Sequence, residues 1–134
     1  MKKSKFFKFT IKGDDLHPMD IKEKVDLPCE IFVKNETTFA GVLKRPVTQK
    51  TNRWVFRSLD QGEMGVNHFL VSQLEIISKH VQPLKEYTTQ YCALIELVVY
   101  EENETSHFNL IISRRAQHLL NKIGVRFSIT FVDF

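Results

Sequence analysis

Cysteine and glycine are scarce in this sequence, and it has no long apolar run. The two cysteines, Cys29 and Cys92, are too few for a disulfide framework, and neither lies in a Cys-x-x-Cys motif or a Cys/His cluster. We therefore expect both thiols to stay reduced as small, buried side chains, with no zinc site. No stretch approaches the roughly 18 apolar residues of a membrane-spanning helix, so we expect no association with a membrane.

We do not expect the start of this sequence to act as a secretory signal. The start, MKKSKFFKF, has the basic end of a signal peptide. However, Lys8 and Lys12 interrupt the apolar stretch that should follow, and no small-residue cleavage site comes after them. We therefore expect a cytoplasmic protein.

The composition is that of a globular protein. Of the 134 residues, 43% are hydrophobic and 26% are charged, and eleven phenylalanines against five glycines predict a compact aromatic core. The net charge is only +3, but residues 1–12 and 42–59 hold five basic residues each and no acid. Because no linker, repeat or low-complexity tract interrupts the chain, we expect a single domain over residues 1–134.

Alternation of apolar and polar side chains predicts several strands. In residues 5–12, Phe7, Phe9 and Ile11 alternate with polar side chains, which is the two-residue period of a half-buried strand. Similar patterns predict strands at 38–43, 52–58, 92–101, 107–112 and 125–131, and either a strand or a loop at 30–34. The polar stretch 44–51 is expected to be a loop, and residues 102–106 are expected to join two strands as a hairpin.

Helical patterns occur between these strands. They predict helices at 18–25, 66–80 and 114–123, with a further turn from Pro83 to Tyr87. Ser113 is expected to cap the last helix at its start, and Gly124 to end it. This order of elements predicts an α+β fold with a mixed, mainly antiparallel sheet and helices packed on one face.

The other face of such a sheet is open to water, and the strand patterns predict its side chains. The expected members are Lys8, Thr10, Lys12, Arg53, Arg57, Glu96, Arg126, Ser128 and Thr130. A register shift of one residue would reverse the two faces, so this prediction depends on the alternation.

Five motifs in order give the chain a family resemblance. They are FKFTI at 7–11, PMDI at 18–21, a Leu-Pro turn at 27–28, WVFRS at 54–58, and a serine-capped helix at 113–120 that leads to a glycine and the strand VRFSI at 125–129. This arrangement resembles an uncharacterised bacterial family, the domain-of-unknown-function family numbered 4279. The resemblance spans nearly the whole chain. It implies the fold, and it implies no catalytic residue or cofactor.

No recognised catalytic motif occurs in the sequence. There is no GxGxxG, P-loop, GxSxG or HExxH pattern, so we expect no catalytic residue, cofactor or metal. His17 beside Asp14 and Asp15 has the composition of an oriented base, but a turn before a helix is the simpler interpretation. Cys92 and His107 can form a thiolate–imidazole pair only across the predicted hairpin, and we favour a buried, inert thiol. For Trp54 we favour core packing over stacking on a ligand.

Three kinds of function remain open at this point. We favour a non-catalytic protein-binding module whose open basic face binds an acidic partner through Lys8, Lys12, Arg53, Arg57 and Arg126. An immunity or inhibitor-type protein is one form of it, by analogy at the fold level alone. The alternative is a nucleic-acid-binding domain, although the open face offers only Phe6 as a clear stacking ring. An enzyme of unrecognised type is the third.

Overall fold

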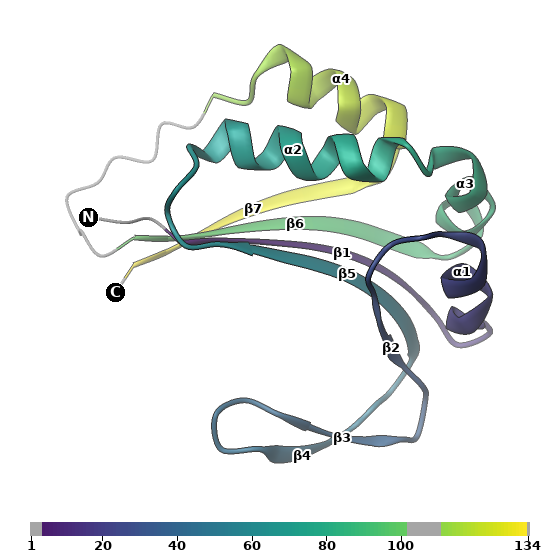
Figure 1. Ribbon diagram of the computed structural model, residues 1–134. Helices are drawn as coiled ribbons and strands as arrows, with labels where there is room; N and C mark the ends of the chain where they lie inside the picture. The colour runs from purple at the N-terminus through teal and green to yellow at the C-terminus, as the bar shows by residue number, and fades with distance from the viewer. Residues whose placement is uncertain (1–3, 102–110, 134) are drawn as a thin grey trace.

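A computed structural model describes residues 4–101 and 111–133 (Figure 1). The strands are β1 (Lys5–Gly13), β2 (Glu30–Phe32), β3 (Thr37–Ala40), β4 (Arg45–Thr48), β5 (Asn52–Asp60), β6 (Cys92–Glu101) and β7 (Arg126–Asp133). The helices are α1 (Pro18–Lys24), α2 (Val66–Ser78), α3 (Val81–Gln90) and α4 (Arg114–Ile123). Within the described ranges, no helix is long and apolar enough to cross a membrane.

The main sheet has five strands in the order β2-β5-β1-β6-β7. All neighbouring pairs are antiparallel except β6 and β7, which run parallel and are connected through α4. Figure 1 shows α2 and α4 side by side over one face of the curved sheet, with α1 and α3 at one end and the β3–β4 hairpin beneath the other face. The predicted α+β fold, with a mixed, mainly antiparallel sheet and helices on one face, is confirmed.

The central strand β1 separates the two faces of the sheet. Its side chains Phe7, Phe9 and Ile11 are fully buried under the helices. Burying a side chain of this size contributes about 2 kcal/mol to folding. Lys8 and Lys12 point the opposite way because successive side chains of a strand alternate.

The ends of α4 follow the sequence signals. The Ser113 hydroxyl accepts a hydrogen bond from the backbone N–H of Ala116 at 3.2 Å, and this satisfies one of the free donors of the first turn. Gly124 ends the helix with a φ of +73°, in the left-handed region that glycine adopts most readily. Both predicted caps are confirmed.

The predicted loop at 44–51 is wrong, because β4 occupies part of it. Strand β4 pairs with β3, and Pro46 lies opposite Phe39. Proline is tolerated there because the hairpin forms a separate two-stranded sheet in which both strands are edges. All four side chains of β4 are exposed. The strand therefore lacks the alternation of buried and exposed positions from which strands are recognised.

One further expectation lies largely outside the described residues, and another differs from the structure. The predicted strand at 107–112 lies largely outside the described residues, as does the hairpin at 102–106, and the described residues 111 and 112 are not in a strand. The sheet neighbours of β6 are β1 and β7. The turn expected around Pro83 is a full helix, α3, in which Pro83 occupies the first turn, where its missing N–H is not required.

A buried ion pair lies on the helix-covered face. The Lys5 ammonium is 3.0 Å from Asp60 Oδ2, and the two side chains are 2% and 9% exposed. The same oxygen accepts hydrogen bonds from the backbone N–H groups of Gly62 and Met64. Burial alone would raise the pKa of Asp60, but the Lys5 ammonium and these two donors outweigh it, so the pKa is lowered from its ordinary value.

Replacing Trp54 tests the core. Its side chain is 0% exposed and meets the Phe9 ring edge-on, with 5.6 Å between ring centroids. Trp54→Ala should lower the free energy of unfolding by about 3–5 kcal/mol in a urea titration, because it leaves a large cavity. Trp54→Phe should lower the free energy of unfolding by less than Trp54→Ala does, since the indole N–H has no hydrogen-bond partner among the described residues. An alanine variant as stable as the parent would contradict the assignment of Trp54 to the core.

Asp60 should make stability depend on pH. Because the pKa of Asp60 is lowered on folding, its contribution is present above about pH 4 and is lost as the pH falls through the folded-state pKa. The free energy of unfolding of Asp60→Asn should therefore fall less than that of the parent between pH 5 and about pH 2, as measured by urea titration. Equal acid sensitivity of the two proteins would exclude this role.

Candidate functional site

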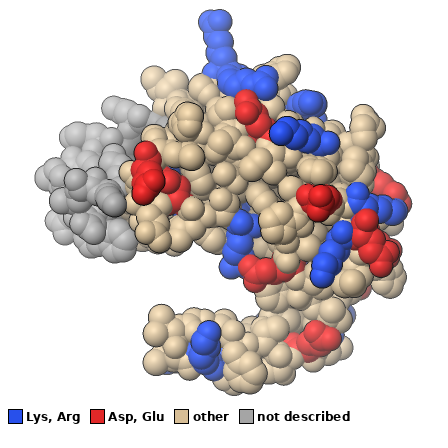
Figure 2. Space-filling view, in the orientation of Figure 1, with Lys and Arg blue, Asp and Glu red and all other residues tan. Residues whose placement is uncertain are grey.

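A groove lies between the open face of the sheet and the β3–β4 hairpin. The hairpin curls beneath the sheet, and Figure 2 shows the hollow between it and the body of the molecule. The groove has a volume of about 630 Å³, within the usual range of ligand sites. Its lining residues are Lys8, Thr10, Lys12, Val47, Thr48, Gln49, Lys50, Thr51, Arg53, Cys92, Leu94, Glu96 and Arg126. We call this feature the basic groove.

Strand pairing brings the predicted open-face residues together on the floor of the basic groove. Lys8 lies directly opposite Arg57 in β5 and Glu96 in β6. Lys12 lies opposite Arg53 in β5 on the same face. Arg126, in β7, joins the floor through its pairing with Leu94. Residues directly opposite each other share a face of the sheet, so the alternation in the sequence predicts this surface correctly.

Four of the five predicted partner-binding residues line the groove. These are Lys8, Lys12, Arg53 and Arg126. The fifth, Arg57, lies on the same face but outside the groove. It forms an ion pair with Glu30 in β2, and its guanidinium lies 5.8 Å from the centroid of the Phe6 ring. Its charge is therefore largely satisfied within the protein.

Like charges face each other across β1 and β5. Such directly opposite pairs destabilise a sheet. The pair Lys8 and Arg57 has an acid next to each of its two positive charges. Glu96 lies opposite Lys8 in β6, and Glu30 forms an ion pair with Arg57. Among the described residues, the pair Lys12 and Arg53 has no acid in its row across the sheet, which continues to Phe32 and Cys92. Uncompensated positive charge is thus concentrated at this end of the groove.

Gln49 connects the hairpin to the groove floor. Its buried side chain accepts a hydrogen bond at Oε1 from Arg53 Nη2, at 2.6 Å, and donates one from Nε2 to Thr38 Oγ1, also at 2.6 Å. The Arg53 guanidinium also lies 4.4 Å from the centroid of the Phe32 ring. Gln49 therefore positions both the hairpin wall and one cation of the floor. Sequence reasoning missed this residue, because a glutamine in a polar stretch carries no signal.

Thr10 lies at the centre of the floor, between Lys8 and Lys12 of β1. Its side chain is only 8% exposed, and its Oγ1 has no hydrogen-bond partner among the described residues. The neighbours directly opposite are Val55 and Leu94, which offer no side-chain acceptor. A buried hydroxyl without a partner destabilises the folded protein by about 1–3 kcal/mol. A ligand in the groove would supply the missing partner.

The other candidates from the sequence have different outcomes. The prediction that both cysteines are buried is wrong: Cys29 is half-buried, and Cys92 is exposed in the groove. His107 lies outside the described residues. Trp54 is in the core, as predicted. His17 is exposed, and the described parts of the chain contain no cluster of three or more metal-ligating side chains.

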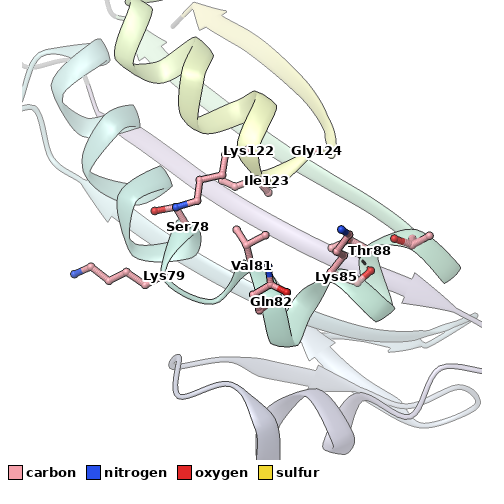
Figure 3. Close-up of a pocket in the computed structure, with 10 residues that line it drawn as sticks. Ser78, Lys79, Val81, Gln82, Lys85, Thr88, Lys122, Ile123 and Gly124 are labelled. Atoms are coloured by element: carbon pink, nitrogen blue, oxygen red, sulfur yellow. Dashed lines mark hydrogen bonds between the residues drawn. The ribbon is translucent and has the colours of Figure 1, made fainter.

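A second cavity, of about 750 Å³, lies between the ends of α2, α3 and α4 (Figure 3). It is lined by the lysines Lys79, Lys85 and Lys122, but Figure 3 shows Lys79 extending away from the other two. Lys79 and Lys122 lie at helix C-termini, where a cation ordinarily stabilises the helix dipole. The helix ends therefore account for the charges of Lys79 and Lys122, and we regard the basic groove as the candidate site.

The fold and this groove define a small α+β domain with a basic concave face. The family model described as a domain of unknown function (DUF4279) matches residues 3–133, so the chain belongs to that family. This match confirms the resemblance found in the sequence. The search of curated proteins and the search of solved structures each returned no significant match.

A double-mutant cycle tests the like-charge pair. Lys12→Gln should raise the free energy of unfolding by about 0.5 kcal/mol at low salt, because it removes repulsion from Arg53. The same substitution should have no such effect in an Arg53→Gln background, and the gain should shrink in 1 M salt, where the Debye length is about 3 Å. Urea titrations of the four proteins measure the coupling. A gain that is independent of Arg53 would show that repulsion is not its cause.

Proposed function

We propose that this chain is a cytoplasmic protein-binding module that holds an acidic segment of another protein in the basic groove. The observation that carries the proposal is the uncompensated pair of Lys12 and Arg53 on the groove floor. Such repulsion lowers stability in the free protein, and carboxylates of a partner would convert it into attraction. Binding sites commonly keep residues, such as facing like charges, that lower the stability of the free protein.

The shape of the site also favours a protein segment. The floor combines cations with apolar and hydroxyl groups, and the hairpin provides a second wall. A partner can therefore gain both complementary charge and buried apolar area, as protein interfaces usually do. Inhibition of the bound protein, as by an immunity protein, is one form of this function that we propose from fold analogy alone.

Nucleic acid fits the groove less well than an acidic protein. Proteins that bind single strands on a sheet stack the bases on exposed aromatic rings. On this face, Phe6 lies beneath the Arg57 guanidinium and Phe32 beneath that of Arg53. These two rings therefore each already have a cation on one face, where a base would have to stack.

Charge reversal in the groove tests the proposal. The triple variant Lys8→Glu, Lys12→Glu and Arg126→Glu should weaken the binding of fluorescein-labelled decaglutamate at least tenfold at low salt, measured by fluorescence anisotropy. A loss of about 1.4 kcal/mol corresponds to that factor. The matched control reverses the same number of exposed charges away from the groove, at Lys22, Lys85 and Arg114, and should bind like the parent.

Separate titrations with nucleic acids distinguish the two kinds of partner. Labelled single-stranded RNA and duplex DNA are titrated under the same conditions at low and near-physiological salt. Tighter binding of either nucleic acid than of decaglutamate, with a steep fall as salt rises, would favour the nucleic-acid alternative. Failure of the parent protein to bind decaglutamate at low salt would contradict the proposed function.

A further inference from the structure

The two walls of the basic groove differ in chemistry. The floor presents Lys8, Thr10 and Lys12 in one row along β1. The facing wall is contributed by the hairpin and the residues after it. Val47, Thr48 and Thr51 are small or apolar, Gln49 is hydrogen-bonded to Arg53, and Lys50 adds one cation. A segment lying between these walls therefore meets the cations of the floor on one side. On the other side it meets mainly small apolar and hydroxyl groups, with Lys50 as the single cation of that wall among the lining residues.

An extended chain has the period that these walls require. Its successive side chains point to opposite sides, and side chains on one side repeat about every 6.6–6.8 Å. Lys8, Thr10 and Lys12 repeat at the same two-residue spacing, because they belong to a strand themselves. An extended segment that runs along β1 can thus place every second side chain over one of these three residues. It stays in register with them because both chains have the same spacing.

Thr10 adds a specific anchor at the middle of this row. Its hydroxyl is more than nine-tenths buried and lacks a hydrogen-bond partner among the described residues. It lines the groove between the two lysines. A carboxylate oxygen that reaches this hydroxyl would accept a hydrogen bond from it, at a position in the row between Lys8 and Lys12. Hydrogen bonds to an ionised acceptor are shorter and stronger than neutral ones.

We propose, on the basis of the function proposed above, that the groove binds an extended protein segment in which carboxylate side chains alternate with small apolar ones. The carboxylates face Lys8, Thr10 and Lys12, and the central one is anchored by the Thr10 hydroxyl. The small side chains between them face Val47 on the hairpin. Specificity then depends on the order of the residues in the partner as well as on its charge.

Two peptides of identical composition test the alternation. Fluorescein-labelled EAEAEAE has alternating carboxylates, and EEEEAAA has the same net charge in a block. The alternating peptide should bind the intact protein at least tenfold more tightly, in anisotropy titrations at low salt. Equal affinity, with both peptides lost in the Lys8, Lys12 and Arg126 triple variant, would overturn this inference and leave the proposed function standing. Absence of binding by both peptides would contradict both.

Substitution of Thr10 tests the anchor. Thr10→Val should weaken EAEAEAE binding about tenfold, equal to 1.4 kcal/mol. It should also raise the melting temperature, because it removes a buried hydroxyl that has no partner. Thr10→Ser keeps the hydroxyl and should retain the affinity. The matched control is Thr130→Val, at an exposed position of β7 outside the groove. Unchanged affinity in Thr10→Val, or an equal loss in Thr10→Ser, would overturn the anchoring role.

Discussion

The alternation of side chains along β1 is the constraint on which the rest of this structure depends. This strand has hydrogen-bonded neighbours on both sides, so each of its residues belongs to one of two faces. Phe7, Phe9 and Ile11 enter the helix-covered core, and Lys8, Thr10 and Lys12 must therefore lie on the opposite face. A shift of one residue would place two lysines in the core, which makes the register strongly specified. The charge pattern of the groove is thus held in place by the packing of the core.

The hairpin converts this charged face into an enclosed site. A two-stranded sheet has little stability of its own, and Gln49 ties this one to the floor through Arg53 and Thr38. One side chain therefore sets the position of the wall and the orientation of a floor cation together. The unpartnered Thr10 hydroxyl and the facing cations both lower the stability of the free protein. Both features become favourable when an anionic segment fills the groove, so stability and binding oppose each other here.

Sequence reasoning succeeded where one face of an element is buried and the other is not. The strand β1 and the helix α2 carry this signal, and the caps at Ser113 and Gly124 carry a different local signal, the residue preferences of helix ends. It failed at β4, because a hairpin exposed on both sides shows no alternation. It also failed at Cys92, because apolar residues such as Leu94 and Val98 occupy the open face of β6 as well as its core face, so its pattern does not distinguish them.

The sequence by itself determined which side chains share a face, because the two-residue period of a strand is a local property of the backbone. It thereby placed Lys8, Lys12, Arg53 and Arg126 on one surface. Only the tertiary structure decided which of these charges meet. Strand order and register place Lys12 opposite Arg53 and bring Glu30 to Arg57. They also place the hairpin so that it closes the groove. Strand order and register are set by contacts between residues far apart in the chain, and no local pattern encodes them.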